Sequence, residues 1–465
     1  MTRSISSIAI VSLGLGIAAA GCSDFLNGND LINDPNNPSN ATLQQSFIAV
    51  QSGQFGFQES TVPLTVCMWV QQCTGIGGRF VEQFGEYTVT DGSFSFDFSS
   101  VYSGGGLIDI RRVESGARAI NDKFYLGIGQ VWEAFLMGTA ADLWGDIPYS
   151  EAVGTVTTPA LDPQMQVYGN ILDLLDSAIA NINAGGAGPG PADLVFGSAD
   201  SLPLQRQRWI QAAYTLKARF LMHTAELNGA PAYTAAIAAA NNGISSSAGD
   251  FKTRHQNVTG EQNIWYSFSL TTFGQDVVAG KALADIMVAR GDPRLPQYFG
   301  KNAFGGYGGQ DVNVQVNDSS VSKLDGTRNA PGFSQPLVTY VENQLILAEA
   351  KHATADDPGA LVNLNNARAV VPLPALVGIT GAALLDSIMT EKYVALFQNL
   401  ETYNDYRRTC LPAITPFATP EFNNQVPGRL FYGIAEANAN PNIPSPSTQL
   451  ATNGFRNAND PAACP

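Results

Sequence analysis

The sequence predicts an all-α fold in which helical hairpins stack side by side, with long irregular loop insertions between them. Apolar residues recur at helical spacing in segments of about a dozen to twenty residues, and these segments come in pairs. Gly, Pro and Asn gather between the pairs. Stacked αα-hairpins bury one apolar stripe per helix economically, so we expect them to lie side by side, although no repeat of about 34 residues is visible.

The helices are expected where apolar periodicity is continuous and Gly or Pro closes each end. A run of alternating Phe residues from Phe94 to Phe98 has a period of two and predicts a short strand or an extended loop. The tail from Pro412 is rich in Pro and Asn and is expected to wrap the surface. The expected helices cover residues up to about 54, then 107–123, 130–143, 164–183, 205–227, 231–242, 276–290, 337–351, 359–371 and 381–399.

Composition narrows the class of function. Of the 465 residues only 14% are charged, and the formal net charge is −15. An acidic, weakly charged chain is a poor partner for nucleic acid or for anionic lipid surfaces, and it suits a neutral ligand. The three histidines, His223, His255 and His352, are scattered and form no zinc motif, so we expect no metal site and no cofactor.

The N-terminus predicts export and lipid attachment. Arg3 is followed by an uncharged apolar run that ends in Ala19-Ala20-Gly21-Cys22. We interpret residues 1–21 as a lipoprotein signal peptide, Cys22 as the lipid-bearing first mature residue, and 22–40 as a tether. The alternative is an ordinary small-residue cleavage site followed by a structural cysteine. No later stretch of the sequence is apolar enough for a membrane span.

A corner at residues 142–152 organises the middle of the chain. Gly145 follows a helical pattern where a positive φ is needed, and Pro148 cannot continue the helix. Trp144 and Tyr149 flank this turn and are large enough to anchor neighbouring helices. A structural corner is one interpretation and direct ligand contact is the other.

This corner, Asp-Leu-Trp-Gly-Asp-Ile-Pro-Tyr-Ser-Glu-Ala, resembles a signature of the SusD/RagB family of outer-membrane nutrient-binding lipoproteins, in particular its starch-binding-associated branch. Residues 209–219, 339–350 and 401–412 resemble three further blocks of that family, in the same order. The resemblance implies a single SusD-like helical domain of tetratricopeptide-like units over 41–465, with loop insertions at about 59–106 and 244–335.

The resemblance also implies a function. A SusD-like protein is anchored to the outer membrane, faces the cell exterior, captures an oligosaccharide and delivers it to a SusC-like TonB-dependent transporter without chemistry. A peptide-binding member of the same system, a lipid-anchored glycoside hydrolase and a protein-interaction scaffold remain as alternatives.

Aromatic residues in the two insertions are the candidate ligand contacts. The flat apolar faces of sugars stack on aromatic rings, and their hydroxyls pair with polar side chains. The alternative is that each ring closes its loop over the helical core. The candidates are Trp69, Arg79, Tyr87 and Tyr102 in the first insertion, and Trp265, Tyr266, Tyr298 and Tyr307 in the second.

Charged residues near the helices have a structural and a catalytic interpretation. Glu401 and Asp405 lie four residues apart, so one helical face carries both, and paired carboxylates serve glycoside hydrolysis. Ion pairing between helices is the simpler interpretation, because these charges lie in the packing blocks. Asp146 is expected to be a turn acceptor.

Four cysteines remain once Cys22 carries lipid, and they allow three disulfide connectivities. We favour the local pairing of Cys67 with Cys73 and of Cys410 with Cys464. A regular helix would separate positions 67 and 73 by about 9 Å, whereas a disulfide needs Cα atoms within about 7 Å. Either the helix ends between them or the bond is absent.

Overall fold

The structure, a computed structural model, describes residues 41–78, 80–199, 201–314, 319–460 and 464. The chain divides into a unit that ends at Ser46 and a compact unit of residues 47–465. The predicted signal peptide, Cys22, the tether and Arg79 lie outside the described residues.

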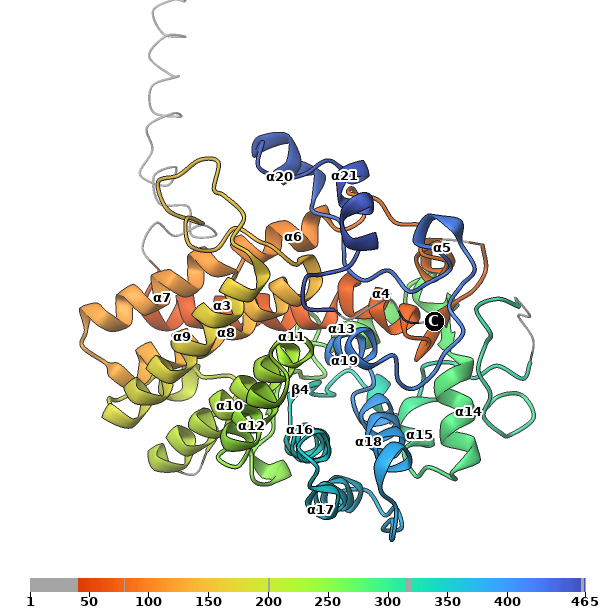
Figure 1. Cartoon of the computed structure of the whole chain (residues 1–465). Helices are drawn as coiled ribbons and strands as arrows, with labels where there is room; N and C mark the ends of the chain where they lie inside the picture. Colours follow the sequence, from red (N-terminus) through yellow and green to blue (C-terminus); the bar gives the residue numbers. More distant parts are fainter. Residues whose placement is uncertain (1–40, 79, 200, 315–318, 461–463, 465) are drawn as a thin grey trace, which may run out of the picture. The chain divides into compact units, whose positions relative to one another are not determined.

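Helices dominate the described chain (Figure 1). Two short antiparallel pairs supply its named strands: β1 (Cys73–Gly75) pairs with β3 (Val277–Ala279), and β2 (Phe251–Lys252) pairs with β4 (Pro336–Val338). The α-helices are α3 (Leu43–Glu59), α4 (Thr61–Trp69), α5 (Phe80–Gly85), α6 (Ser95–Tyr102), α7 (Leu107–Ala119), α8 (Lys123–Trp144), α9 (Gln164–Ala184), α10 (Leu202–His223), α11 (Ala225–Asn228), α12 (Ala230–Ala240), α13 (Ile264–Ser269), α14 (Lys281–Ala289), α15 (Leu295–Tyr298), α16 (Tyr340–Ala353), α17 (Asp357–Arg368), α18 (Gly381–Ala395), α19 (Glu401–Thr409), α20 (Ile434–Ala439) and α21 (Pro446–Ala451).

The helices pack as neighbouring pairs. The pairs in contact are α7 with α8, α8 with α9, α10 with α12, and α16 with α17, and α12 against α16 joins the last two. Ala218, Ala236 and Ile346 form a shared core between α10, α12 and α16. The predicted all-α fold of stacked hairpins is therefore confirmed.

Helix α8 is the centre of this core. Every residue from Phe124 to Trp144 is buried, which fits a helix that is surrounded on all sides. It is followed by Gly145, whose φ of 78° is the positive value that the sequence predicts. Trp144 is fully buried and donates from its indole nitrogen to the carbonyl of Phe431 at 2.9 Å. The corner is thus part of the core.

Two expectations about local structure are wrong. The alternating Phe run is not extended, because Ser95–Tyr102 forms α6 with Phe94 and Phe98 buried and Phe96 exposed. The tail does not merely wrap the surface, since Leu430, Phe431 and Tyr432 are buried. The first insertion is also less irregular than expected, as it contains α4, α5 and α6.

Candidate functional site

Two adjoining pockets lie between the C-terminal half of α3, the start of α4 and the segment from Thr253 to α13. Strand pairing of β2 with β4 places this segment, and Thr253 continues the contact by donating its N–H to the carbonyl of Gln335 at 3.0 Å. Asn263 caps α13, because its side chain accepts the N–H of Tyr266 at 3.0 Å. These contacts fix both ends of the segment that forms the pocket wall.

The larger pocket has a volume of about 420 Å³ and walls of mixed character. Its polar lining is suited to hydroxyl groups, whereas its apolar lining is suited to the C–H face of a sugar ring. Polar residues are Ser52, Arg254, His255, Gln256, Glu261 and Gln262, and apolar residues include Ile48, Phe55, Leu194 and Ile264.

The smaller pocket, called the recess below, has a volume of about 170 Å³. Ile264 lines both pockets, so the recess opens beside the larger one. Its lining residues are Glu59, Ser60, Thr61, Leu64, Ile264, Trp265 and Phe268.

A buried ion pair connects α3 to the loop that forms the pocket wall. The carboxylate of Glu59 accepts from His255 Nε2 at 2.8 Å, and from Asn263 Nδ2 and the Ile264 N–H at 3.3 Å each. His255 Nδ1 lies 3.2 Å from the carbonyl oxygen of Glu261, which can only accept. Both ring nitrogens therefore face an oxygen acceptor, which favours the protonated imidazole, in which both nitrogens donate.

The pKa of His255 reflects this arrangement. Burial disfavours the charged ring, but the hydrogen bond and negative charge of Glu59 outweigh burial, so the pKa of His255 is raised from its usual value. The side chains of Glu59 and His255 are 0% and 7% exposed. This pair fixes the loop against α3 and shapes the larger pocket.

The structure brings two of the predicted aromatic residues to this region. Trp265 is buried and lines the recess together with Thr61 and Leu64 of α4. Tyr266 is the next residue of α13 and is half-buried, but it lines neither pocket.

Trp69 and Tyr87 do not form a ligand platform in this structure. Trp69 is 0% exposed and packs edge-on against Tyr87, with ring centroids 6.1 Å apart, and against Tyr403 at 5.7 Å. The Tyr87 hydroxyl accepts the N–H of Phe417 at 3.1 Å, and burial raises its pKa well above the usual value. Both rings belong to the core, and the expectation of ligand contact is corrected for them.

The other aromatic candidates lie apart from the pockets. Tyr102 donates its hydroxyl to the carbonyl of Pro148 at 2.9 Å, and Tyr298 is buried and stacks on Phe397 at 4.6 Å. Tyr307 is half-buried on the loop after α15 and lines neither pocket.

Sequence reasoning missed Glu59, His255 and Asn263 as site residues, because nothing in the sequence signals that they meet.

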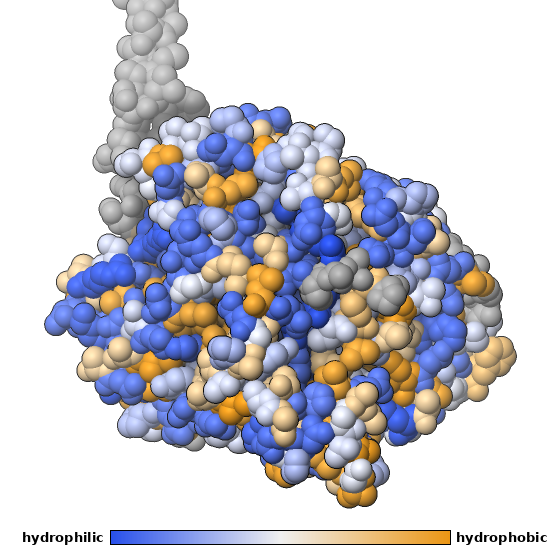
Figure 2. Space-filling model, viewed as in Figure 1, coloured by the Kyte–Doolittle hydropathy of each residue, from blue (hydrophilic) through white to orange (hydrophobic). Residues whose placement is uncertain are grey.

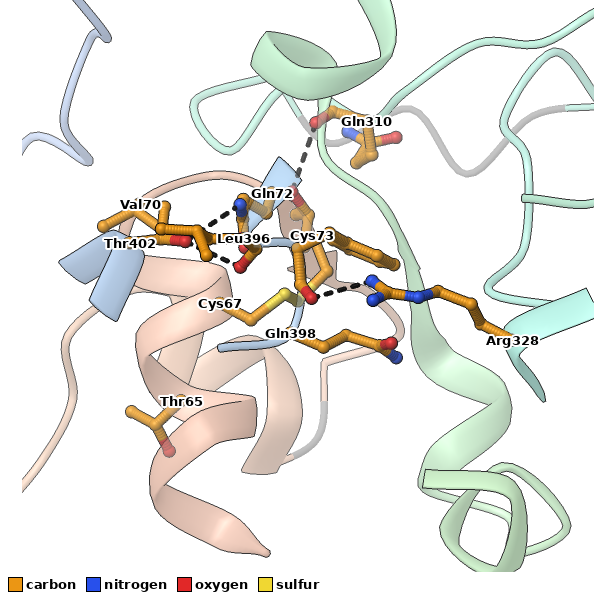
Figure 3. Close-up of a disulfide and its surroundings, with 12 residues drawn as sticks. Thr65, Cys67, Val70, Gln72, Cys73, Gln310, Arg328, Leu396, Gln398 and Thr402 are labelled. Carbon is orange, nitrogen blue, oxygen red and sulfur yellow. Dashed lines mark hydrogen bonds between the residues drawn. A yellow bond between two sulfur atoms is a disulfide. The ribbon is translucent and has the colours of Figure 1, made fainter. Parts of the chain in front are cut away.

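The cysteines form the two local pairs that the sequence favours, and Figure 3 shows the Cys67–Cys73 disulfide. Helix α4 ends at Trp69, the chain turns through Gln71 with φ at 57°, and the Cα atoms of Cys67 and Cys73 lie 5.5 Å apart. The neighbouring Gln72 donates to the carbonyl of Tyr393 at 2.6 Å and thereby ties this turn to α18. Cys410 and Cys464 have their Cα atoms 5.2 Å apart.

The conspicuous charges form buried ion pairs between helices. Glu401 contacts His223 at 2.6 Å, and Asp405 contacts both Lys392 and Arg408 at 2.9 Å. Neither carboxylate lines either pocket. The structural interpretation of these charges therefore fits, because both carboxylates are buried and pair with cationic side chains.

Three further observations concern the surface, possible membrane spans and possible metal sites. Figure 2 shows a face on which apolar residues are scattered among polar ones. Within the ranges that the structure describes, no helix combines the length and apolar character that a bilayer span requires. In the same ranges, no group of three or more His, Cys, Asp or Glu side chains could hold a metal ion.

A family model described as starch-binding associating with outer membrane matches residues 35–356, which is more than half of the 465 residues. The chain belongs to the SusD-like family. The predicted family is thereby confirmed, and the match covers the corner and the blocks at 209–219 and 339–350 but not the block at 401–412. No curated protein matches the sequence.

Solved structures of this SusD-like fold are similar over most of the chain. A chitin-binding protein shares 21% identity at a TM-score of 0.71, covering 90% of this chain and 98% of that one. A chitin-binding SusD homolog from Flavobacterium johnsoniae shares 18% at 0.70, covering 88% and 98%. A SusD/RagB family protein from Bacteroides thetaiotaomicron shares 20% at 0.63, covering 87% and 95%. At sequence identities this low, the structural similarity shows that the fold is shared and nothing more.

Proposed function

We propose that this SusD-like protein is a lipid-anchored outer-membrane lipoprotein that binds an oligosaccharide in the two pockets between α3, α4 and α13. It delivers the ligand to a SusC-like TonB-dependent transporter and performs no chemistry on it. The observation that carries the proposal is the pair of adjoining pockets, one with mixed walls and one next to Trp265. The chitin-binding proteins of the same fold support a glycan rather than a peptide.

The mechanism follows from the chemistry of the walls. Phe55 and Ile264 offer apolar surface to a sugar ring, while Gln256 and Gln262 offer amide donors and acceptors to its hydroxyls. The Glu59–His255 pair holds the loop in place before the ligand arrives, so less ordering is required on binding.

Titration calorimetry with glycan panels tests this proposal. Trp265→Ala should weaken oligosaccharide binding by roughly 1–3 kcal/mol, by analogy with base–aromatic stacking. Trp69→Ala is the matched control, because Trp69 lies in the core and its loss should lower the unfolding temperature without a selective loss of affinity.

Three results would count against the proposal. One is unchanged affinity in folded Trp265→Ala. Another is binding of peptides in place of glycans. The third is turnover of a bound glycan, which would favour the hydrolase alternative. Co-purification with a TonB-dependent transporter from outer membranes tests the delivery step, and a membrane extract in which no transporter accompanies the protein would contradict it.

A further inference from the structure

The turn from Gln256 to Glu261 forms part of the wall of the larger pocket and is closed by its own hydrogen bonds. The N–H of Gln256 donates to the carbonyl of Glu261 at 3.0 Å, and the N–H of Glu261 donates to the carbonyl of Val258 at 2.9 Å. The side chain of Gln256 also donates to the Glu261 carboxylate at 2.8 Å. Because Gln256, Gly260 and Glu261 line the pocket, the position of this turn against α3 sets the shape of the pocket.

His255 connects this turn to α3. The chain on either side has its own backbone anchors, at Thr253 before the turn and at Asn263 after it. Between these anchors, the Nε2 atom of His255 lies 2.8 Å from the carboxylate of Glu59, and its Nδ1 atom lies 3.2 Å from the carbonyl oxygen of Glu261. One ring therefore links the helix, through Nε2, to the turn, through Nδ1.

This link requires a proton on both ring nitrogens. A neutral imidazole has one nitrogen that donates and one that accepts, whereas both neighbouring oxygens can only accept while Glu59 is ionised. Either neutral form of His255 therefore places a lone pair against an oxygen, at Nδ1 or at Nε2. Deprotonation also removes the charge that strengthens the bond to the carboxylate. A neutral ring consequently loses the helix or the turn.

The charges around the ring favour the protonated form at neutral pH. Burial lowers the pKa of His255, but the hydrogen bond and charge of Glu59 and the bond to the Glu261 carbonyl outweigh burial and raise it above the usual value of 6.5. Glu59 is the charged group on α3, and Arg254 and Glu261 are the charged residues beside the ring on its own segment. Because the pKa is raised, the ring is charged below pH 6.5 and loses its proton as the pH rises past the raised value.

Resting on the proposed function, we infer that His255 is a positioning residue whose proton holds the turn 256–261 against α3, so that glycan capture weakens when the ring is deprotonated. His255 lines the larger pocket and Glu59 lines the recess, so their contact lies where the two pockets meet. When the ring is neutral, the turn leaves α3 and the Gln256 amide moves away from the ligand. Capture in this pocket is thereby linked to protonation of one side chain.

Hydrogen–deuterium exchange of the full chain without ligand tests the attachment of the turn. Mass spectrometry measures it between pH 6.5 and 9, with correction for the intrinsic effect of pH on exchange. Peptides that cover residues 255–264 should lose protection about tenfold over this range, since a hydrogen bond between charged groups is lost. The range stays below the pKa of about 10 of His223, so the buried junction around that residue keeps its charge.

Four variants assign the loss of protection to His255. His255→Arg keeps a charge that does not titrate in this range, so its protection should be high at every pH, and His255→Gln should be poorly protected at every pH. Glu59→Gln removes the negative charge, so the midpoint should move to lower pH. His352→Gln is the matched control, because it removes a histidine that pairs with Asp357 away from the pockets, and it should behave like the natural chain.

Titration calorimetry with the hexamer of N-acetylglucosamine tests the link to capture. The probe is chosen because chitin-binding proteins share the fold. Its affinity for the natural chain should fall about tenfold from pH 6.5 to 9, in parallel with protection. The affinity of His255→Gln should be low at both pH values, and His352→Gln should repeat the natural chain.

The outcomes separate this inference from the proposed function. Protection that does not change with pH, or a pH-dependent loss that persists in folded His255→Gln with an unchanged midpoint in Glu59→Gln, overturns the positioning role of the His255 proton. Hexamer affinity that stays constant while protection falls overturns the link to capture and leaves glycan binding intact. A pH-dependent turn in a protein that binds no glycan at any pH overturns the proposed function and leaves the attachment of the turn in place.

Discussion

Replacing His223 with glutamine should destabilise the fold in a pH-dependent way. His223 ends α10 and lies between two carboxylates from other helices, Asp142 of α8 at 2.7 Å and Glu401 of α19 at 2.6 Å. Its side chain is 2% exposed. Burial alone would disfavour the charged ring, but the two carboxylates outweigh burial and raise the pKa of His223 to about 10.

The size of the effect follows from this pKa. With an unfolded pKa of about 6.5, preferential protonation of the folded state contributes about 4 kcal/mol at pH 7. Because the folded pKa is the higher one, the contribution is fully present below about pH 6.5 and is lost as the pH rises toward 10. Removing one partner of a buried ion pair costs about 3–5 kcal/mol of folding stability, which agrees with the value obtained from the pKa of His223. A unit of this size has an unfolding entropy of about 0.9 kcal/mol/K, so the unfolding temperature should fall by about 4 °C.

Calorimetric unfolding of the natural chain and His223→Gln between pH 6.5 and 10 measures the effect. The difference in unfolding temperature should be largest at the acid end and shrink toward pH 10. His352→Gln is the control, since His352 pairs with Asp357 at 2.7 Å on the surface, with side chains 19% and 23% exposed, and should change stability by less than about 1 kcal/mol. A difference for His223→Gln that does not depend on pH would refute the charged, carboxylate-bound imidazole.

Three further predictions concern the cysteines. Cys22→Ala should release the protein from membranes, because lipid attachment is predicted at that residue, and a variant that stays membrane-bound after a salt wash would contradict lipid anchoring. The double variant Cys410→Ser/Cys464→Ser should lose about 2–4 kcal/mol of stability and expose the tail to limited proteolysis. Non-reducing peptide mapping of the natural chain should recover the Cys67–Cys73 and Cys410–Cys464 peptides, and crossed pairs would refute the local pairing.

The helical core was predictable because its signals are local. Apolar spacing and Gly or Pro at the ends located most helices to within a few residues, as α18 shows: its expected start at Gly381 is its observed start.

The strand or extended loop predicted for the Phe run was wrong for a specific reason. Phe94 and Phe98 are four residues apart, so a period of two over five residues also places them on one helical face, and they are buried while Phe96 is 80% exposed.

The site was only partly predictable because its contacts are long-range. Trp265, which lines the recess, was selected for its aromatic, loop-rich surroundings, but the same signal selected Trp69, which is buried in the core. Composition cannot separate a ring that closes a loop from a ring beside a pocket. Glu59 and His255 are 196 residues apart, and their pairing exists only after β2 meets β4. No local sequence pattern indicates that these two residues pair.

Residues 457–460 contact α8, α10 and α19 at the junction where these three helices meet. This arrangement bears on the order in which parts of the fold form. Asn457 donates to the carbonyl of Asp142 at 2.7 Å, across 315 residues, and Asn459 donates to the carbonyl of His223 at 2.8 Å, across 236 residues. Asp460 pairs with Arg407 at 3.2 Å. Contacts between residues so far apart in the sequence form late. Proteins that depend on them fold more slowly than simple helical bundles. The helical hairpins can therefore form early as local units, but their junction closes only when the last segment of the fold arrives.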